Sequence, residues 1–385
     1  MRIGIVAGET SGDILGAGLI RALRERLPQA RFEGVAGPEM QAAGCEALYP
    51  AETLAVMGLS EVLAHLPRLL SVRRHLVRHF RADPPDVFIG IDSPDFNLGL
   101  EKTLRRSGIP TVHYVSPSIW AWRPKRVFKV GHAADLTLAI LPFEPPLYAK
   151  HGFKAVFVGH PLADAIPDHV DRVKLRSELH LPEDGAVVAL LPGSRGTEVD
   201  RLGKLFLDTA QWLAAQKPGL RFAIPAATPK LNELLKRQIR MYAPDLALTL
   251  VEGHSRDVLG AADAVLLASG TAALEAMLIQ CPMVVAYKLS NLSYAFIRAF
   301  DLLKIPYVSL PNLLAARRLV PEFLQYDASP AAMGAELLKL LEDPAVRGEQ
   351  LGGLGALTHM LRRGADQRAA EAVLGLLESR GAVRS

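Results

Sequence analysis

The sequence predicts an α/β protein built from two doubly wound, Rossmann-like domains that face a cleft. The chain has 385 residues, more than one typical hydrophobic core accommodates. Apolar runs of strand length alternate with helical patterns, and they are nearly continuous in Val, Ile, Leu and Ala, as in parallel strands that helices cover on both faces. In each half, one such run leads into a glycine-rich turn that opens a helix.

The first half follows this alternation from its first residues. The predicted strands are 2–7, 31–36, 86–91, 110–115, 136–141 and 155–159. The predicted helices are 13–26, 57–65, 67–81, 97–107 and 125–133. These segments form the predicted N-terminal domain, residues 1–165.

The second half repeats the plan. The predicted strands lie near 187–191, 220–225, 246–251, 264–268 and 283–287, and the predicted helices near 198–216, 229–242, 255–261 and 271–279. Prolines and charges interrupt the pattern at 160–172, which predicts the domain boundary there. We therefore expect a second Rossmann-like domain at 166–343. A helical segment at 344–385 follows, which we expect to pack back on the first domain.

Composition narrows the class of protein. Hydrophobic residues make up 50% and charged residues 22% of the chain, which is an ordinary globular balance. The two cysteines, Cys45 and Cys281, are far apart, so they predict neither a disulfide scaffold nor a metal site. No secretory signal or membrane-spanning run is recognisable. We expect a cytoplasmic protein without a metal or other cofactor.

The first glycine-rich turn, residues 8–13, follows the first predicted strand. Gly8 and Gly12 allow a backbone to approach a substrate closely, and Ser11 or Asp13 is expected to cap the next helix. A tight turn with a cap is the structural alternative. Glu9 favours a functional role, because a carboxylate repels phosphate but can hold a sugar hydroxyl or accept a proton.

Asp92 ends a strongly apolar predicted strand. Such a residue lies at the carboxyl edge of the sheet, where doubly wound folds bind their ligands. Partial shielding from water would bring its pKa toward that of a general base, so we favour a functional role over a structural one. Asp95 or Asn97 is the expected cap of the next helix.

Aromatic residues follow the next strand. His113 lies inside that strand and is expected to be a core histidine. Trp120 and Trp122 could line a pocket for a ring or an acyl chain, or simply pack at a domain edge.

The second glycine-rich turn contains Gly193, Ser194 and Arg195. Backbone N–H groups at a helix start and a guanidinium both suit phosphate, although the spacing is not that of a Walker loop. Ser194 or Thr197 could instead cap the helix. Capping does not account for Arg195, because a cation is disfavoured at a helix N-terminus. A bound anion would remove that conflict.

A third polar turn contains Ser269, Gly270 and Thr271, again between a strand and a helix. Glu275 lies one helical turn later on the same face as Thr271. Its carboxylate could accept both hydroxyls of a ribose, or it could be an ordinary surface residue. Asn312 interrupts a later apolar run and is either a turn residue or a ligand contact.

The stretch 56–81 mixes leucines with arginines and carries a single acid. Basic amphipathic helices can bind an anionic lipid surface, while an ordinary surface helix is the alternative. The residues predicted to contact lipid are Leu66, Leu69, Leu70, Arg73 and Arg74.

Six motifs, in order along nearly the whole chain, resemble those of the lipid-A-disaccharide synthase family. They are VAGETSGD, GIDSPDFN, HYVSPSIWAWRPKRV, LLPGSR, LLASGTAALE and YVSLPNLLA. This family comprises inverting glycosyltransferases of the GT-B class. The absence of Asp-x-Asp from the chain agrees with a family that requires no metal.

The resemblance implies a specific reaction, in which residues 1–165 form the acceptor and lipid side and residues 166–343 bind the UDP-sugar donor. The family transfers 2,3-diacylglucosamine from UDP to 2,3-diacylglucosamine 1-phosphate, forming a β-1′,6-linked disaccharide 1-phosphate and UDP in lipid A synthesis at the cytoplasmic face of the inner membrane. Asp92 is the first candidate for the base and Glu9 the second. Arg195, Ser194 and Thr271 would stabilise the departing diphosphate, Glu275 would hold the ribose, and Asn312 would contact substrate.

Other functions stay open at this point. A UDP-sugar epimerase shares the fold, and a non-catalytic nucleotide- or lipid-binding protein would need neither Asp92 nor Glu9. A different GT-B transferase would prefer an unacylated donor. We expect an anionic membrane surface as a partner and no nucleic acid, and the sequence does not determine the oligomeric state.

Overall fold

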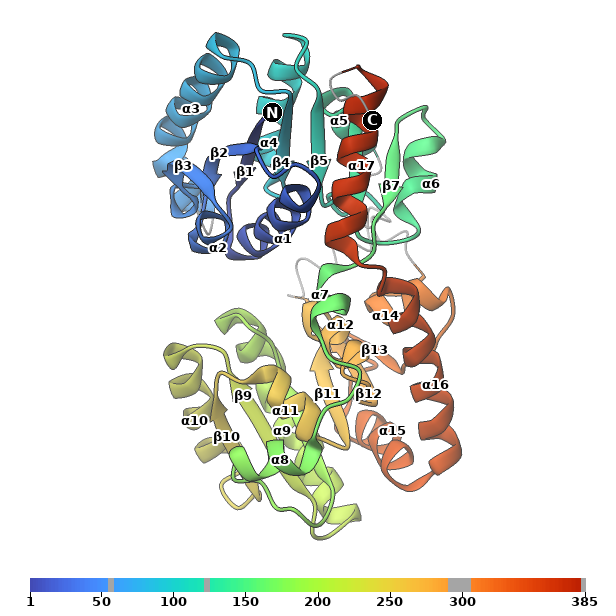
Figure 1. The fold of residues 1–385 in the computed structure, drawn as a ribbon. Coiled ribbons are helices and arrows are strands. Elements are labelled where there is room, and N and C mark those ends of the chain that lie inside the picture. The colour runs from blue at the N-terminus through green and yellow to red at the C-terminus, as the bar shows by residue number, and fades with distance from the viewer. Residues whose placement is uncertain (55–58, 121–124, 290–305, 382–385) are drawn as a thin grey trace. The chain divides into compact units, whose positions relative to one another are not determined.

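The structure, a computed structural model, describes residues 1–54, 59–120, 125–289 and 306–381, without the side chains of 59–65. It divides into two compact units. Unit 1 comprises Met1–Asp164 and Leu361–Ser385, and unit 2 comprises Ala165–Met360. Each unit is an α/β domain around one sheet (Figure 1).

Unit 1 contains a seven-stranded parallel sheet in the order β3-β2-β1-β4-β5-β6-β7. The strands are β1 (Arg2–Ala7), β2 (Arg31–Ala36), β3 (Cys45–Pro50), β4 (Val87–Ile91), β5 (Thr111–Tyr114), β6 (Leu136–Ala139) and β7 (Ala155–Phe157). The chain leaves β1 toward β2 and later returns to its other side at β4. The strand order therefore reverses between β1 and β4, the place where doubly wound sheets bind ligands.

Helices cover both faces of this sheet. They are α1 (Thr10–Arg26), α2 (Pro38–Ala42), α3 (Leu59–Ala82), α4 (Pro94–Arg105), α5 (Arg126–Ala133), α6 (Glu144–Ala149) and α17 (Ala365–Ser379), with the short η1 (Ala51–Thr53). Ile3, Ile5 and Ala7 pack in the core that contains α1 and α17, while Val6 packs with α3 and α4. This alternation along β1 is the period of two expected of a strand with two covered faces.

Unit 2 contains a six-stranded parallel sheet in the order β10-β9-β8-β11-β12-β13. The strands are β8 (Val187–Leu191), β9 (Arg221–Ala226), β10 (Leu248–Glu252), β11 (Ala264–Ala268), β12 (Met283–Tyr287) and β13 (Glu322–Leu324). The order reverses between β8 and β11. The predicted fold class, two doubly wound domains, is confirmed.

The helices of unit 2 follow the same plan. They are α8 (Arg172–Glu178), α9 (Gly196–Gln216), α10 (Pro229–Tyr242), α11 (Ser255–Ala261), α12 (Thr271–Leu278), α14 (Leu310–Ala315), α15 (Pro330–Glu342) and α16 (Pro344–Leu361), and α7 (Pro161–Ala165) lies at the unit boundary. Helix α9 packs between α10 and α15. The core of this unit is formed mainly by apolar residues of β8, β9, β11 and α9.

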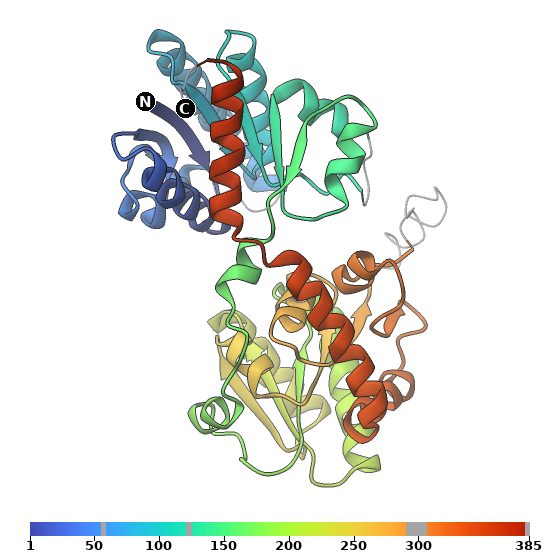
Figure 2. The ribbon, with the colours of Figure 1, turned by 45° about the vertical axis from the view of Figure 1, so that its right-hand side comes forward.

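The described part of the C-terminal segment, predicted at 344–385 as one helical segment, contains two helices that belong to different units. Helix α16 belongs to unit 2, whereas α17 packs along α1 in unit 1 (Figure 2). Ala369, Ala370, Val373 and Leu377 of α17 are fully buried in the unit 1 core. The polypeptide therefore returns to its first domain to complete that core.

Several boundaries differ from the predictions. Edge strands β3 and β13 were not predicted, because β3 is largely half-exposed and β13 spans only three residues, so neither contains a continuous apolar run. The helix predicted to end before Pro67 continues through it as α3, and residues 57 and 58 of that prediction lie outside the described residues.

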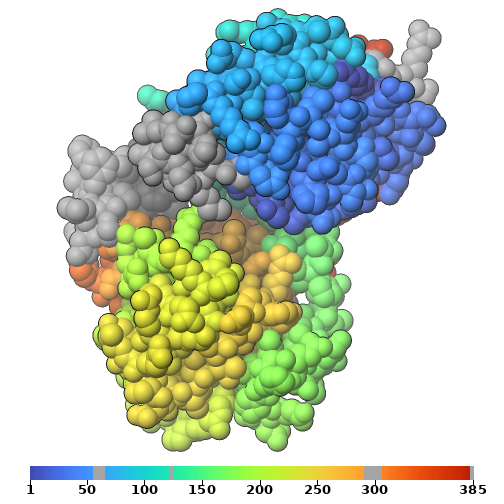
Figure 3. Space-filling view, turned by 90° about the vertical axis from the view of Figure 1, so that its left-hand side faces the viewer, coloured from blue at the N-terminus to red at the C-terminus, as the bar shows by residue number. Residues whose placement is uncertain are grey.

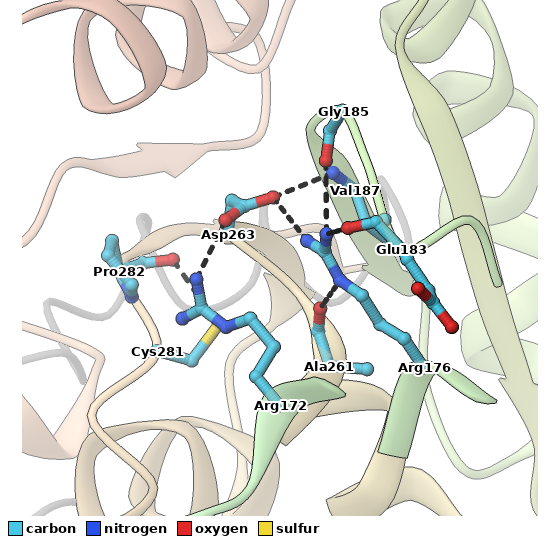
Figure 4. A network of polar contacts seen from close by, with 9 residues as sticks. All are labelled: Arg172, Arg176, Glu183, Gly185, Val187, Ala261, Asp263, Cys281 and Pro282. Carbon is cyan, nitrogen blue, oxygen red and sulfur yellow. Dashed lines mark hydrogen bonds and ion pairs between the residues drawn. The ribbon is translucent and has the colours of Figure 1, made fainter. Parts of the chain in front are cut away.

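An ion-pair network joins α8 to the start of the sheet in unit 2 (Figure 4). Asp263 accepts hydrogen bonds from Arg172 at 2.8 Å, from Arg176 at 2.7 Å and from the Val187 N–H at 2.8 Å. Arg176 also donates to the carbonyl oxygens of Ala261, Glu183 and Gly185. Because Val187 and Asp263 stand where β8 and β11 begin, the network fixes the edge of the sheet opposite the carboxyl ends of its strands.

Candidate active site

The predicted donor-binding residues of unit 2 line one pocket. This pocket of about 550 Å³ opens at the carboxyl ends of β8 and β11, where the strand order reverses. Its lining includes Gly193, Ser194, Arg195, Ser269, Gly270, Thr271 and Glu275. Helices α9 and α12 both begin beside it, so their positive ends favour an anion in the pocket.

The turn after β8 presents polar groups to this pocket. Arg195 is the N-cap residue of α9, and its side chain is 80% exposed. The helix therefore starts with a cation, and its cap makes no side-chain hydrogen bond, so the alternative that Ser194 or Thr197 caps it is wrong. Sequence inspection missed Glu198, whose carboxylate accepts a 3.0 Å hydrogen bond from the Ser194 N–H.

The turn after β11 forms the facing wall. The Ser269 hydroxyl donates to the carbonyl oxygen of Val308 at 2.9 Å, which ties this turn to the segment before α14. A Cβ on Gly270 would have no neighbour within 4 Å, so a ligand can approach the backbone there. Glu275 is paired with Arg256 at 2.9 Å, and its side chain is only 18% exposed. Arg256 thus holds Glu275 in place at the pocket, so Glu275 is not an ordinary solvated surface residue.

Asn312 lies beneath this wall rather than in it. Its side chain is fully buried. The amide donates to Val320 O at 2.9 Å and to Glu322 at 2.7 Å, and its oxygen accepts from the N–H groups of Leu319 and Val320. Glu322 in turn accepts from Val308 N and Ser309 N. In this structure the side chain therefore holds the segment 308–320, which contains α14, and a contribution to substrate binding would act through that segment.

In unit 1, two predicted candidates meet where the strand order reverses. The Gly8 turn follows β1 and Asp92 follows β4, and these strands are neighbours. A Cβ on Gly8 would lie 2.6 Å from the Ser93 hydroxyl, so glycine is what lets the two turns pack together. Glu9 and Ser11 are exposed, Asp92 is half-buried and Gly12 is buried.

The backbone beside Asp92 is in the left-handed region. The φ angles are 48° at Asp92, 42° at Ser93 and 76° at Val115. Positive φ is uncommon for a non-glycine residue and strained for a β-branched one. The Asp92 N–H donates to Tyr114 O at 2.8 Å, so the strained residues directly follow two neighbouring strands. Such strain clusters at functional sites because the surrounding structure must enforce it.

Asn97 holds the Asp92 turn in place. Its buried amide donates to the carbonyl oxygens of Asp92 at 2.9 Å and Ile91 at 3.1 Å, and more weakly to Val6 at 3.4 Å. Helix α4 begins at Pro94, so the prediction that Asp95 or Asn97 caps it is wrong. The side chain instead joins the ends of β1 and β4, a tertiary use that local spacing does not reveal.

Asp13 likewise has a different role from the predicted one. Helix α1 begins at Thr10 after Glu9, with no side-chain cap, so neither Ser11 nor Asp13 caps it. The buried Asp13 carboxylate accepts from the N–H groups of Gly37, Glu39 and Met40 at 2.9–3.1 Å. It therefore caps α2, the short helix that follows β2.

Buried polar groups support the segment after β5. Glu144 is 1% exposed and accepts from Leu141 N–H at 3.2 Å. Burial raises the pKa of Glu144 to about 8, although hydrogen bonds from Leu141 and from the side chains of Ser116 and Trp120 act against this shift. Trp120 also packs edge-on against Phe143, while Trp122 lies outside the described residues.

We expect Glu144 to make unit 1 less stable as pH rises. The folded chain keeps this proton up to about pH 8, whereas an unfolded carboxyl loses it near pH 4.5, so folding is weakened between these values by roughly 3–4 kcal/mol. Glu144→Gln stays neutral and should lose this pH dependence. The free energy of unfolding in urea, measured at pH 5 and at pH 8, tests this dependence. Glu52→Gln, at an exposed carboxyl group, is the control. If the free energy of unfolding changes with pH as much in Glu144→Gln as in the control, the expectation is contradicted.

His113 is confirmed as a core residue. It is fully buried, and its Nδ1 lies 2.7 Å from the Glu101 carboxylate, which is equally buried. Burial raises the pKa of Glu101. Neither side chain reaches solvent, so the pair is part of the support behind β4 and β5.

The sequence of this chain is similar to those of known proteins over nearly its whole length. A family model described as lipid-A-disaccharide synthetase matches residues 3–373. Lipid-A-disaccharide synthases of Pseudomonas paraeruginosa and Pectobacterium atrosepticum are 53% and 52% identical over 380 residues, covering 99% of both chains in each comparison. The chain belongs to the lipid-A-disaccharide synthase family. The enzyme class and the role in lipid A disaccharide synthesis predicted from the sequence are thereby confirmed.

Solved structures show that this synthase family shares its fold with other enzymes. A UDP-GlcNAc 2-epimerase from Neisseria meningitidis bound to UDP-GlcNAc has a TM-score of 0.66 at 14% identity, covering 97% of this chain and 100% of its own. A calicheamicin glycosyltransferase has a TM-score of 0.58 at 16% identity, covering 98% of each chain. At such identities only the fold is comparable. The family match therefore decides against the epimerase alternative, which the fold alone would leave open.

Two further findings concern the described part of this synthase-family chain. No group of three or more His, Cys, Asp or Glu side chains among the described residues could hold a metal ion. In the same residues, no helix is long and apolar enough to cross a bilayer. The family implies a UDP-sugar donor and a lipid-phosphate acceptor.

Proposed function

We propose that this chain transfers 2,3-diacylglucosamine from its UDP donor to the 6-hydroxyl of 2,3-diacylglucosamine 1-phosphate. The products are the β-1′,6-linked disaccharide 1-phosphate and UDP. The observation that carries the proposal is the pocket of unit 2, in which two helix starts, Arg195 and Glu275 line one space. This combination suits a diphosphate joined to a ribose.

Unit 2 would bind the donor. The Arg195 guanidinium and the backbone N–H groups of Ser194 and Thr271 would contact the diphosphate, and they would stabilise the charge that it gains as the bond to the sugar breaks. Glu275, held by Arg256, would accept hydrogen bonds from the ribose. Gly193, Ser269 and Gly270 would give the ligand close access to the backbone.

Unit 1 would supply the base. Asp92 would take the proton of the acceptor hydroxyl as its oxygen attacks the anomeric carbon, and the electron pair of the breaking bond would leave with UDP. One displacement inverts the configuration at that carbon. Gly8, Ser11 and Gly12 would contact the acceptor, and Glu9 is the second candidate for the base. No metal or cofactor takes part in these steps.

The direct test uses purified protein with both lipid substrates and EDTA, followed by mass spectrometry of the disaccharide and of UDP. Disaccharide formed in equal amount with UDP would support the proposal. If a folded protein that binds UDP forms no disaccharide, the proposed reaction is wrong. Conversion of the donor without acceptor would instead favour an epimerase, and a preference for UDP-N-acetylglucosamine would favour a different transferase.

Helix α3 is proposed to bring the enzyme to an anionic membrane surface at the cytoplasmic face of the inner membrane. Leu66 is 42% exposed, and Leu69 and Leu70 are half-buried. Arg73 and Arg74 make no ion pair with any described carboxylate, and together with Arg78 and Arg81 they line one groove. Figure 3 shows unit 1 from the side on which the described surface of α3 is exposed.

The other face of α3 belongs to the core, which limits this proposal to the outward residues of the helix. Val72, Leu76 and Phe80 are spaced by four and are buried in the core against β1 and β4. Leu76 and Phe80, which the sequence pattern placed among the apolar residues of the basic stretch, are therefore core residues. The proposed lipid-contacting set is Leu66, Leu69, Leu70, Arg73 and Arg74, none of which belongs to this buried core.

We expect Arg74→Glu to weaken binding to phosphatidylglycerol vesicles about 30-fold, since each charge near an anionic surface contributes about 1 kcal/mol and this variant changes the charge by two units. Co-sedimentation measures it. Arg237→Glu on α10 makes the same change of charge in unit 2 and serves as the control. Equal binding by both variants would remove α3 from the membrane contact.

A further inference from the structure

The carboxylate of Glu198 already interacts with Ser194 and Arg195, the residues proposed to bind the diphosphate. Glu198 Oε2 accepts the Ser194 N–H at 3.0 Å, and its other oxygen, Oε1, is 3.9 Å from Arg195 Nη1. Glu198 also lines the donor pocket and is 37% exposed. The predicted anion site of unit 2 therefore contains an anion of the chain's own.

The backbone is shaped to admit this carboxylate. Gly193 has a φ of 139°, and a Cβ at this position would overlap the Glu198 side chain. Glu198 is in the first turn of α9, whose positive end stabilises a carboxylate. Any larger residue at Gly193 would push Glu198 away from the Ser194 N–H.

We propose that Glu198 is an internal anion that competes with the diphosphate for Ser194 N–H and Arg195, and that a bound nucleotide displaces it. This inference rests on the proposed donor site. The Glu198 carboxylate repels a bound nucleotide more strongly when the nucleotide carries more negative charge. Free UDP carries about one more negative charge than UDP joined to a sugar, because its terminal phosphate is no longer esterified. The repulsion therefore weakens product binding more than donor binding and favours release of UDP.

A purely structural role makes a different prediction. Glutamate at the third position of a helix commonly reaches back to N–H groups near the helix start, and glutamine does this equally well. Glu198→Gln keeps that hydrogen bond and removes only the charge. A capping residue would thus tolerate the change without any effect on ligand affinity, whereas a competing anion would not.

The experiment is calorimetric titration of wild type and Glu198→Gln with UDP, with UDP-2,3-diacylglucosamine and with uridine. We expect UDP to bind about 10-fold more tightly to the variant, equivalent to about 1.4 kcal/mol. The donor should gain less, and uridine, which lacks phosphate, should be unchanged. Glu233→Gln on α10, with its side chain 64% exposed, makes the same change of charge away from the pocket. Glu198→Ala should shift UDP affinity in the same direction.

The possible outcomes separate this inference from the proposed function. Wild type that binds UDP, with Glu198→Gln equal to Glu233→Gln or weaker, would overturn the competing-anion role and leave the donor site standing. Failure of wild type, both Glu198 variants and the Glu233→Gln control to bind UDP would overturn the donor site and this inference together. Equal tightening for uridine and UDP would also contradict it, because the effect would not involve phosphate.

Discussion

Asp92→Asn is expected to lower kcat for disaccharide formation about 10³-fold, within the range that a general base contributes. Asparagine has nearly the same shape but cannot accept the proton of the acceptor hydroxyl. It also tolerates the φ of 48° at this position, because Asn and Asp are the non-glycine residues most often found there. Alanine would add backbone strain to the chemical change. Asparagine is therefore the better test, with UDP and disaccharide followed by mass spectrometry.

The control for this experiment is Asp95→Asn. Asp95 is in the first turn of α4, three residues after Asp92, and its side chain is 83% exposed; among the described residues it pairs only with Arg126 and Lys129. Wild-type rates for this variant would exclude a general effect of charge on that turn. If Asp92→Asn keeps more than about a tenth of the wild-type kcat, Asp92 is not the base. Loss of activity in Glu9→Gln would then transfer that role to Glu9.

The sequence predicts well which residues stand at the carboxyl edge of each sheet, because the relevant information is local. Continuous apolar runs identify buried parallel strands, and a glycine turn after a run marks the carboxyl end of a strand. Gly8, Asp92, Gly193 and Gly270 are all found at such ends. Strand order cannot be deduced from these patterns alone, yet it is the order that makes β1 and β4, or β8 and β11, neighbours.

Roles that depend on tertiary contacts were not predictable in this way. Asp13 and Asn97 have the residue types and positions of helix caps, but each forms its hydrogen bonds with a different element. Asn312 is a loop residue by sequence, and only packing shows that it is buried. Arg256 and Glu198 are on helices of ordinary composition, so no local signal separates them from surface charges. Their importance follows from the pocket, which Glu198 lines and in which Arg256 pairs with the lining residue Glu275.

Arg195→Ala is expected to reduce kcat/KM by about 10²–10³-fold, the usual cost of removing one donor that stabilises charge in the transition state. Arg195→Lys should recover only part of this loss, since an ammonium group cannot bind phosphate in a bidentate manner. Arg237→Ala, an exposed arginine of α10, is the matched control. Steady-state kinetics with both lipid substrates measures all three variants.

Stability provides a second and opposite signature for Arg195. A cation at a helix N-terminus is unfavourable by about 0.3–1 kcal/mol, and the distance of 3.9 Å to Glu198 compensates little at a side chain that is 80% exposed. Arg195→Ala should therefore leave the unliganded protein as stable as wild type or slightly more stable in urea. Loss of activity together with loss of stability would indicate an arginine needed for folding. Loss of activity without loss of stability identifies one that is placed for the ligand.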